Sequence, residues 1–332
     1  MADYIAPRIE SGHFATKALT DLPGRVLAIT MEEPWQLVQK HIGWEPDHVH
    51  FVTDMDQETV EGLDSTLPGC DIVVGIGGGS CMDTAKYLAW KRGCRMILVP
   101  TIVSVDAPLT NTVAVRIDKK VTYVADIFPE ELLIDYDLIQ QAPPVLNRAG
   151  ACDIASIVTA LHDWKLAFRD VNEHYDAHIA QQAQDCLNRL DIEAHEIYGV
   201  TPRGIDTIID LFRIEVEFCA RLGSSRPEEG SEHIVCYNME HLTRRHFLHG
   251  DLVALGIFAM TRLQENQHEF AVSLMRRTGL RYKCPDASHD EIAECLRTLK
   301  AFKEKAGLFY SVVDTEPIDE DFITETLAEL GR

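Results

Sequence analysis

Three polar side chains after residue 150 of this 332-residue chain could together hold a metal ion. Asp153 lies at the head of an apolar helical stretch, His233 lies in the run SEHIVCYNME, and His249 precedes a second apolar stretch. Two imidazoles and one carboxylate form a three-ligand set that leaves a fourth position open for water or a substrate oxygen. Chemistry alone does not rank His249 above the nearby His241 and His246, and an Asp at a helix start is ordinarily a cap.

A run of three glycines in the first half could hold an anionic group. The segment DIVVGIGGGSCMDTAKYLAW is typical of a strand, a glycine turn and a helix. Because Gly77, Gly78 and Gly79 lack side chains, their N–H groups can approach a phosphate closely. A helix that begins at Ser80 would direct its positive dipole end to the same place, which predicts a pyrophosphate cradle. Ser80 and Asp83 also fit an S-x-x-D capping box, and the run matches neither G-x-G-x-x-G nor the P-loop consensus.

The glycine turn must be positioned by a sheet. Between Arg25 and Tyr136, short β-branched runs alternate with amphipathic stretches, a pattern typical of a mainly parallel sheet in an α/β domain. The predicted strands lie at 25–29, 48–52, 71–76, 95–100, 112–117 and 131–136.

The polar trio must be positioned by helices. After Pro143-Pro144 the apolar residues recur at spacings of three and four, which is typical of amphipathic helices. The change in pattern predicts an α/β domain at 1–144 and an all-helical domain at 145–332. We expect the site between them, because clefts concentrate at domain interfaces. Helices are predicted at 154–168, 208–222, 252–263, 291–307 and 322–331, with loops at 201–204 and 224–230.

The composition excludes several function classes. The chain carries 31 Lys and Arg against 53 Asp and Glu, and a net charge of −22 argues against nucleic-acid binding through a basic face and against binding to anionic membranes. Nine cysteines without a C-x-x-C pair favour reduced thiols over a disulfide framework or a zinc knuckle. No leader-like run and no apolar run of ~18 residues occurs, so we expect no membrane span and a cytoplasmic location.

The glycine turn and the polar trio occur within motifs that resemble one superfamily. GIGGGSCMDTAK is similar to the G-G-G-S-x-x-D-x-A-K signature of the iron-containing alcohol dehydrogenase, glycerol dehydrogenase and dehydroquinate synthase superfamily. VPTIVSVDAP, AGACDIASIVTALHDWKLA, GSSRPEEGSEH and HGDLVALG follow in the order and spacing of that superfamily. The second and third of these look most like sn-glycerol-1-phosphate dehydrogenases. The resemblance implies a Rossmann-like domain followed by an all-helical domain, the dehydroquinate synthase-like architecture.

The resemblance also implies roles for individual residues. The three glycines, Ser80 and Asp83 would hold the pyrophosphate of NAD or NADP, and Asp106 would hydrogen-bond a substrate hydroxyl. It selects His249 rather than its neighbours as a metal ligand. Two further groups complete the implied site: Thr101, Ser104 and Thr110 at the nicotinamide-ribose end, and Asp153, His233 and His249 around the metal.

The metal is predicted from a missing side chain. Iron-dependent members of the superfamily carry a fourth ligand, a His four residues after the Asp, where this chain has Ile157. With three protein ligands and an open position, the resemblance and the coordination chemistry both predict zinc. We therefore expect a zinc-dependent interconversion of an alcohol and its ketone, with hydride transfer to or from the nicotinamide.

Two departures from the family pattern leave the substrate open. Tyr237 stands where sn-glycerol-1-phosphate dehydrogenases have a second His, and Asp106 is followed by Ala-Pro, as in glycerol dehydrogenases. The expected substrate is sn-glycerol-1-phosphate or dihydroxyacetone phosphate, with an unphosphorylated polyol as the alternative. Arg226 is the candidate phosphate contact, and a solvated loop Arg explains it equally well. Asp106, Asp153 and Tyr237 are the predicted catalytic residues.

Several alternatives remain at this point. Glu32 and Glu33 follow the first predicted strand, where a carboxylate could bind ribose hydroxyls and favour NAD over NADP, although a surface pair of glutamates is the plainer explanation. A dehydroquinate synthase-like cyclase lacks support because no G-G-K run occurs between Leu109 and Arg116. A non-catalytic regulator would not need the retained ligands and glycine turn. The resemblance further implies a homo-oligomer.

Overall fold

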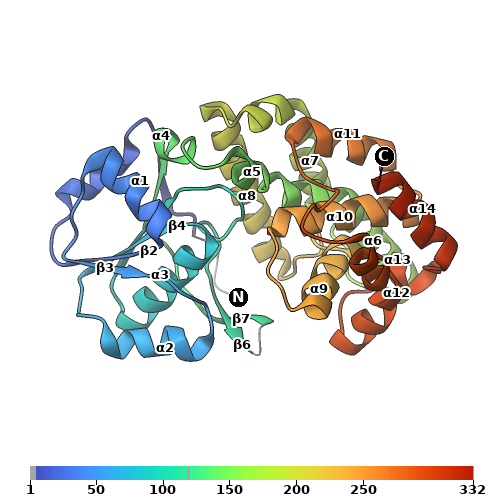
Figure 1. Ribbon diagram of the computed structural model, residues 1–332, viewed down its shortest axis with the longest axis horizontal. Helices are drawn as coiled ribbons and strands as arrows, with labels where there is room; N and C mark the ends of the chain where they lie inside the picture. Colours follow the sequence, from blue (N-terminus) through green and yellow to red (C-terminus); the bar gives the residue numbers. More distant parts are fainter. Residues whose placement is uncertain (1–4, 118–119, 332) are drawn as a thin grey trace. The chain divides into compact units, whose positions relative to one another are not determined.

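The computed structural model describes residues 5–117 and 120–331 and has a parallel sheet in the first half of the chain (Figure 1). Six strands lie in the order β1-β8-β5-β4-β2-β3, and every neighbouring pair is parallel. β2, β4 and β8 are buried along their whole length, which is typical of a parallel sheet covered on both faces. The strands span Arg8–Gly12 (β1), Val26–Thr30 (β2), His48–Phe51 (β3), Ile72–Gly77 (β4), Arg95–Pro100 (β5) and Glu131–Asp135 (β8).

Helices pack against this sheet and bury its core. α3 contacts β2, β4 and β5, and most of its side chains between Cys81 and Ala89 are buried. Ile72, Val74 and Ile97 of the central strands form the core together with Val38 of α1. This arrangement confirms the predicted α/β class. The helices here are the 3-10 helix η1 (Ala15–Asp21), α1 (Glu32–Ile42), α2 (Gln57–Thr66), α3 (Gly79–Arg92), α4 (Tyr136–Ile139) and α5 (Pro144–Arg148).

Two strands lie outside the main sheet. β6 (Thr112–Ile117) and β7 (Lys120–Asp126) form an antiparallel hairpin of their own. The strand predicted over 112–117 therefore exists, but its expected place in the parallel sheet was wrong. β1 was not predicted, because its run RIESG is polar and mostly exposed and is held only by pairing with β8 at the edge of the sheet.

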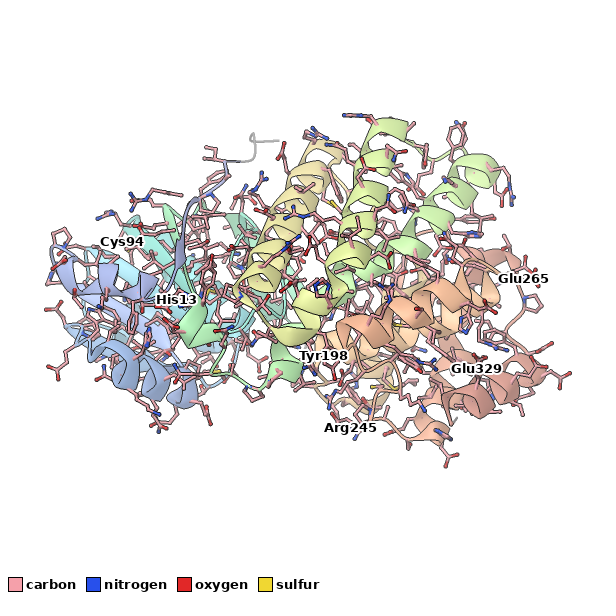
Figure 2. The ribbon with its side chains drawn as sticks, turned by 90° about the horizontal axis from the view of Figure 1, so that it is seen from above. His13, Cys94, Tyr198, Arg245, Glu265 and Glu329 are labelled. Carbon is pink, nitrogen blue, oxygen red and sulfur yellow. The ribbon has the colours of Figure 1, made fainter. Side chains whose placement is uncertain are left out.

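The second half of the chain is helical, as predicted, and Figure 2 shows these helices with their side chains. The five predicted helices all form, with their ends shifted by a few residues, and α7, α9, α11 and α13 are additional. The loop at 224–230 is confirmed, but the loop at 201–204 was wrong, since Pro202 takes the first helical position that suits proline. No helix among the described residues is long and apolar enough to cross a membrane. These helices are α6 (Ala151–Val171), α7 (Ala177–Gly199), α8 (Pro202–Leu222), α9 (Ser231–Thr243), α10 (His249–Leu263), α11 (His268–Thr278), α12 (His289–Ala306), α13 (Val312–Thr315) and α14 (Glu320–Leu330).

α10 is the central helix of this half. Its residues from Gly250 to Thr261 are all buried, and it packs against α6, α9 and α11. At Gly256 a β-carbon would lie 2.3 Å from the backbone oxygen of Glu232 in α9, so the crossing requires glycine. The close approach fixes the first turn of α9 beside α10.

The chain divides into two compact units. The α/β unit runs to Asn147 and includes Val200–Ile209, and the helical unit comprises Arg148–Gly199 and the chain from Asp210 onward. A single boundary between residues 144 and 145 was predicted, so the return of the chain at Val200–Ile209 was not anticipated. The Tyr136 hydroxyl donates to the Asp206 carboxylate at 2.7 Å and ties this segment to the α/β unit.

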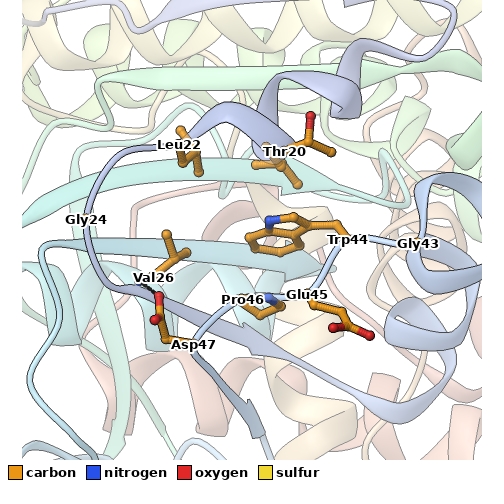
Figure 3. Close-up of a pocket in the computed structure, with 10 residues that line it drawn as sticks. Thr20, Leu22, Gly24, Val26, Gly43, Trp44, Glu45, Pro46 and Asp47 are labelled. Carbon is orange, nitrogen blue, oxygen red and sulfur yellow. Dashed lines mark hydrogen bonds between the residues drawn. The ribbon is translucent and has the colours of Figure 1, made fainter.

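A pocket of about 280 Å³ opens at the amino end of β2 (Figure 3). Trp44 and Leu22 line it, and the Asp47 carboxylate beside them accepts the backbone N–H of Val26 at 2.7 Å. The glycine turn follows the carboxyl end of β4, so it lies at the opposite ends of the parallel strands from this pocket. This pocket is therefore separate from the predicted cradle.

Replacing Gly256 by Ala should destabilise the helical unit, because the new methyl group would overlap the Glu232 carbonyl. We expect the free energy of unfolding to fall by about 1–3 kcal/mol, the usual cost of overpacking a core, in urea denaturation followed by circular dichroism. Gly62 in α2 has open space around it and is the matched control. Gly62→Ala should leave stability unchanged or raise it by up to about 1 kcal/mol. An unchanged midpoint for Gly256→Ala would contradict the close crossing.

Candidate metal centre and dinucleotide-binding turn

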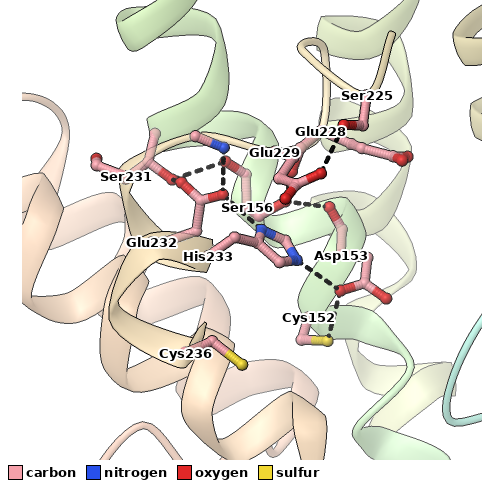
Figure 4. Close-up of polar contacts among 12 residues, drawn as sticks. Cys152, Asp153, Ser156, Ser225, Glu228, Glu229, Ser231, Glu232, His233 and Cys236 are labelled. Atoms are coloured by element: carbon pink, nitrogen blue, oxygen red, sulfur yellow. Dashed lines mark hydrogen bonds and ion pairs between the residues drawn. The ribbon is translucent and has the colours of Figure 1, made fainter. Parts of the chain in front are cut away.

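Asp153, His233 and His249 converge in the helical unit. Asp153 lies in the first turn of α6, His233 in the first turn of α9, and His249 is the first residue of α10. Oδ1 of Asp153 lies 3.2 Å from Nε2 of His249. The same oxygen lies 3.7 Å from Nε2 of His233, a contact that Figure 4 shows. One carboxylate oxygen therefore faces the same nitrogen of two imidazoles. The trio selected by family resemblance lies together, at the first turns of three different helices.

A buried carboxylate orients the His233 ring. Oε1 of Glu232 lies 2.7 Å from Nδ1 of His233 and also accepts the backbone N–H of Gly230 at 2.7 Å. The Thr159 hydroxyl donates to the other Glu232 oxygen at 2.5 Å. With Nδ1 engaged in this way, Nε2 is the nitrogen left to face Asp153. A carboxylate behind a metal-binding His commonly fixes its ring and raises its basicity.

The electrostatics of this cluster favour a cation. Burial by itself would raise the pKa of Asp153, but the imidazoles of His249 and His233 hold that pKa well below its usual range. Burial likewise opposes the charge on His249, yet the Asp153 carboxylate outweighs it and raises the pKa of His249 to about 10. Asp153 and Glu232 also raise the pKa of His233 above its usual value, against the effect of burial. Positive charge at this point stabilises the buried carboxylates.

The donor set fits a divalent metal ion. Imidazole nitrogen and carboxylate oxygen are ordinary ligands of zinc and of iron, and the Glu232 carboxylate supports the His233 ring from behind. Cys152 also lies close, with its Sγ 3.0 Å from Oδ1 of Asp153, and it forms a group with Asp153 and His249 that could hold a metal ion, although burial raises the pKa of this thiol well above its usual value. Ile157 is fully buried and offers no fourth ligand. Asp153, His233 and His249 are thus the residues suited to hold the ion.

Tyr237 lies one turn after His233 and is bound to a carboxylate. Its hydroxyl donates to Oε1 of Glu229 at 2.5 Å, and the Ser225 hydroxyl donates to Oε2 at 2.5 Å. The rings of Tyr237 and His233 are 6.0 Å apart, and the Glu229 charge contributes to the raised pKa of His233. Glu229 was missed in the sequence, where its only signal is its place between the S-R-P run and the His233 ligand.

Arg226 has a structural role. Its side chain is buried, and Nε lies 2.8 Å from Oε1 of Glu173. Nη2 donates to the backbone oxygens of Asp163 and Tyr310 at 3.2 and 3.0 Å, and the guanidinium lies over the Phe309 ring. The interpretation of Arg226 as a solvated loop residue was wrong, because the side chain is buried, and its contact with a substrate phosphate stays a prediction. It joins the loop before α9 to α6 and to the segment before α13.

In the α/β unit, the glycine turn has the form expected of an anion cradle. α3 begins at Gly79, and Gly77 has φ +141°, a conformation that favours glycine. A β-carbon at Gly77 would lie 2.6 Å from Sγ of Cys81. The predicted capping box was wrong: the N-cap residue is Gly78 and no side chain caps the helix. The N-terminus of α3 therefore presents backbone N–H groups that no side chain caps.

The turn lies at the switch point of the sheet. After β2 the chain moves outward to β3, and after β4 it moves the other way to β5, so the carboxyl ends of β2 and β4 flank the point where ligands bind in such sheets. α1 begins there too, and Pro34 lies 3.6 Å from the β-carbon position of Gly77. Glu32 and Glu33 occupy the first turn of α1 and are exposed. Two helix N-termini thus meet beside the glycines.

The buried side chain of Lys86 contacts Asp83 and Thr110, two residues that the family resemblance assigned to the cofactor. Nζ of Lys86 donates to the Thr110 hydroxyl at 2.8 Å and to the Thr112 backbone oxygen at 3.1 Å, and lies 3.7 Å from Oδ1 of Asp83. Burial raises the pKa of Asp83 to about 6, even though the Lys86 charge opposes this. Lys86 had no assigned role in the sequence, although it stands in the glycine motif three residues after Asp83. It joins α3 to the loop that leads into β6.

The other residues assigned to the nicotinamide end follow β5. Thr101 and Ser104 are buried, and the Thr101 backbone N–H donates to the Gly77 backbone oxygen at 3.0 Å. Asp106 is half-buried and raises the pKa of Lys86, which burial lowers. The β5 loop and the glycine turn therefore adjoin at the same edge of the sheet.

Comparison with known proteins agrees with this geometry. A family model described as iron-containing alcohol dehydrogenase matches residues 26–143. A glycerol-1-phosphate dehydrogenase [NAD(P)+] of Aeropyrum pernix is 30% identical over 240 residues, which cover 71% of this chain and 67% of that protein. The chain belongs to the iron-containing alcohol dehydrogenase family. Two further relatives in this family with the same name, from Staphylothermus marinus and Hyperthermus butylicus, are 36% and 33% identical, and the match spans 60% of the length of each.

Solved structures agree on the fold of this family member. A probable glycerol dehydrogenase from Sinorhizobium meliloti has a TM-score of 0.71 at 17% identity, with 99% of this chain and 98% of that chain covered. Glycerol dehydrogenase from Schizosaccharomyces pombe has a TM-score of 0.69 at 16% identity, with 99% and 91% covered. The predicted α/β domain followed by a helical domain is thus confirmed.

Lys86→Met should destabilise the protein, because it leaves the half-buried Asp83 carboxylate without its partner. We expect the free energy of unfolding to fall by about 3–5 kcal/mol, measured by urea denaturation. The double variant Asp83→Asn with Lys86→Met removes both charges and should recover most of that loss. If the double variant is no more stable than Lys86→Met, the ion pair is not the reason that the lysine is buried.

Proposed function

We propose that this chain is a metal-dependent NAD(P) oxidoreductase that interconverts a small polyol or polyol phosphate and its ketone. The observation that carries the proposal is the approach of two imidazole Nε2 atoms to one buried oxygen of Asp153. The glycine turn at the switch point of the sheet supports the dinucleotide half. The relatives named glycerol-1-phosphate dehydrogenase [NAD(P)+] make sn-glycerol-1-phosphate and dihydroxyacetone phosphate the first choice of substrate pair.

Asp153, His233 and His249 would hold the metal ion, and zinc is the proposed metal because Ile157 leaves only three protein ligands. A bound zinc ion supplies Lewis acidity toward an alcohol or carbonyl oxygen. Glu232 keeps His233 in the tautomer whose Nε2 is available for coordination. The aliphatic side chain at Ile157 keeps the neighbouring face of α6 free of polar groups.

The α/β unit would hold the dinucleotide. Backbone N–H groups around Gly78 and Gly79, together with the positive end of α3, would bind the pyrophosphate. Glu32 and Glu33 lie at the carboxyl end of β2, where a carboxylate accepts ribose hydroxyls and repels a 2′-phosphate, so NAD is the proposed cofactor. Lys86 holds Asp83 and Thr110, and these two residues shape the loop rather than contact the cofactor.

The substrate would meet residues from the β5 loop. Asp106 is the proposed partner of a substrate hydroxyl, and Thr101 and Ser104 are the proposed contacts of the nicotinamide ribose. Asp106 lies near enough to Lys86 for its charge to raise the pKa of that lysine. Hydride transfer itself is chemistry of the nicotinamide, and the protein contributes position and charge.

An unphosphorylated polyol is the second candidate, and two observations favour it. Arg226 is buried against Glu173 and cannot reach a phosphate without losing that partner. The charged group bound to Tyr237 is the Glu229 carboxylate, which would repel a phosphate near His233. In this reading Tyr237 and Glu229 together present a polar, anionic surface suited to neutral hydroxyl groups.

A paired initial-rate assay tests the proposal. Purified protein loaded with zinc is given dihydroxyacetone phosphate or dihydroxyacetone with NADH or NADPH, and cofactor oxidation is followed by absorbance. Steady oxidation with either ketone supports the dehydrogenase, and the ratio of kcat/KM values decides the substrate class. Substrate turnover without net cofactor change would instead indicate a cyclase, and cofactor binding without turnover on a broad panel would indicate a regulator.

Asp153→Asn, His233→Ala and His249→Ala should each remove the bound metal and turnover together, because each deletes one of three ligands. Metal content is measured by inductively coupled plasma mass spectrometry and turnover by initial rates. His246, an exposed imidazole near His249, provides the control: His246→Ala should retain both metal and activity. Full activity of a ligand variant after exhaustive chelation would rule out this metal centre.

Glu232→Gln should weaken zinc binding without removing a ligand, because it neutralises the carboxylate that orients His233. The dissociation constant, measured by competition with a chromophoric chelator, should rise about 10–100-fold. Glu240 lies on the same helix and serves as the matched control through Glu240→Gln. Equal affinities for the two variants would show that Glu232 serves only the fold.

Glu229→Gln should shift substrate preference toward the phosphorylated ketone, because it removes the carboxylate bound to Tyr237. We expect the ratio of kcat/KM for dihydroxyacetone phosphate to that for dihydroxyacetone to rise about tenfold, equivalent to about 1.4 kcal/mol. Glu240→Gln should leave the ratio unchanged. An unchanged ratio in Glu229→Gln would place the substrate's variable end away from Tyr237.

A further inference from the structure

Two partly exposed cysteines meet at the amino edge of the parallel sheet, away from the glycine turn. Cys70 lies two residues before the start of β4, and Cys94 lies one residue before β5. β4 and β5 are neighbours with Ile72 opposite Arg95, and the Arg95 backbone N–H donates to the Asp71 backbone oxygen at 3.3 Å. Continued by one residue, this register places Cys94 opposite Asp71, the chain neighbour of Cys70, at the spacing of adjacent strands of about 4.8 Å.

The two thiols already interact. Cys70 and Cys94 each shift the pKa of the other, and Nη1 of Arg92 lies 3.7 Å from Sγ of Cys70. Arg92 is itself fixed, because its Nε donates to Oδ1 of Asp64 at 2.9 Å and its Nη1 to the Pro68 backbone oxygen at 2.8 Å. A guanidinium held in this way is a permanent positive charge beside one of the two sulfurs.

These contacts make Cys70 a nucleophile and Cys94 its partner. The Cys94 thiol and the Arg92 charge lower the pKa of Cys70 to about 6, against the effects of burial and of Asp71. The same pairing raises the pKa of Cys94, which keeps that thiol protonated until Cys70 has reacted. Burial has the opposite effect on other cysteines and raises the pKa values of Cys81 and Cys295 to about 12. Thiolate character and access are the properties of reactive cysteines.

We propose that Cys70 and Cys94 form a reversible redox pair that reacts with a peroxide and closes to a disulfide. The Cys70 thiolate attacks one peroxide oxygen, the O–O bond breaks, and the released hydroxide takes a proton to give water and a sulfenic acid at Cys70. The Cys94 sulfur then attacks the Cys70 sulfur, forming the S–S bond and breaking the S–O bond, and the hydroxyl leaves as water with the Cys94 proton. Two thiols are oxidised, and the peroxide is reduced to water. An added dithiol reverses the reaction by exchange.

The disulfide would join two loops that the fold already holds near each other. It would connect the loop after α2 to the end of α3, and α3 begins at the glycine turn. The crosslink should therefore form without rearrangement of the sheet and should raise the thermal midpoint of the α/β unit. This inference is independent of the proposed function, since neither cysteine belongs to the metal centre or to the cradle. Cys94 is labelled at the periphery of the α/β unit in Figure 2.

The chain offers a clean test by peptide mapping. Protein at neutral pH is treated with stoichiometric hydrogen peroxide, quenched with N-ethylmaleimide and cleaved on the amino side of Asp. Cleavage separates Cys70, in Asp64–Cys70, from Cys81, in Asp71–Met82, and leaves Cys94 in the fragment that begins at Asp83. The expected product is a crosslink between the first and third fragments, two hydrogens lighter than their sum, that disappears after reduction with a dithiol.

Two variants make the outcome decisive. Cys94→Ser should stop the reaction at the Cys70 sulfenic acid, which dimedone traps on the Asp64–Cys70 fragment, and should abolish the crosslink. Cys219→Ser, which removes a partly exposed cysteine of the helical unit, should behave as the wild type. Oxidation of wild-type Cys70 to sulfinic acid without a crosslink would overturn the proposal. A Cys70 disulfide between two chains, or a crosslink formed only in denaturant, would overturn it as well.

Discussion

Asp153 is a carboxylate buried at the start of a helix, and one of its oxygens faces two imidazoles. Taking a charge of this kind out of water costs several kcal/mol unless it is paired and hydrogen-bonded. The helical unit meets this constraint by bringing the first turns of α6, α9 and α10 to one point. Glu232 adds a second buried carboxylate behind His233, so the two carboxylates of the cluster require positive charge beside them, on the imidazoles or on a bound cation. The packing of three helices therefore depends on the charge that they enclose.

This constraint explains features that are otherwise unrelated. Gly256 is needed because α10 must pass close to the Glu232 backbone, and a side chain there would separate the two imidazoles. Asp163, ten residues after Asp153 on α6, accepts the backbone N–H groups of Ser231 and Val312 at 2.7 and 2.8 Å. It thereby fixes where α9 begins, and burial raises its pKa to about 6. Arg226 strengthens the same junction through Glu173.

Regular elements were predicted well where burial follows a simple period. The β-branched runs of β2, β4 and β5 and the apolar spacing of α6, α8, α10, α12 and α14 are signals of that kind. α9 was missed because Glu232, His233 and Asn238 are buried polar residues, which hide its core-facing side from a hydrophobic pattern. β1 was missed for a similar reason, since its position depends on pairing with β8 rather than on its own residues.

The site residues likewise fall into those that a local pattern predicts and those that it does not. The glycine turn could be predicted locally, and family resemblance was needed to choose His249 over His241 and His246. The roles of Arg226, Glu229 and Lys86 depend on partners remote in sequence, such as Glu173, which no local pattern indicates. These contacts form only when the chain folds. Whether such a charged side chain faces a ligand or the protein interior therefore cannot be predicted from the neighbouring sequence.

Two buried cationic side chains limit the ways in which this acidic chain could bind an anion. Lys86 and Arg226 are both fully buried, and each is neutralised by a carboxylate of its own unit, Asp83 and Glu173 respectively. A phosphate that used either charge would have to compete with that carboxylate. The groups at the switch point that remain suited to an anion are the backbone N–H groups of the glycine turn and the first turns of α1 and α3. Binding through backbone dipoles adds no net charge, so it is compatible with a chain of net charge −22 and selects by close approach rather than by long-range attraction.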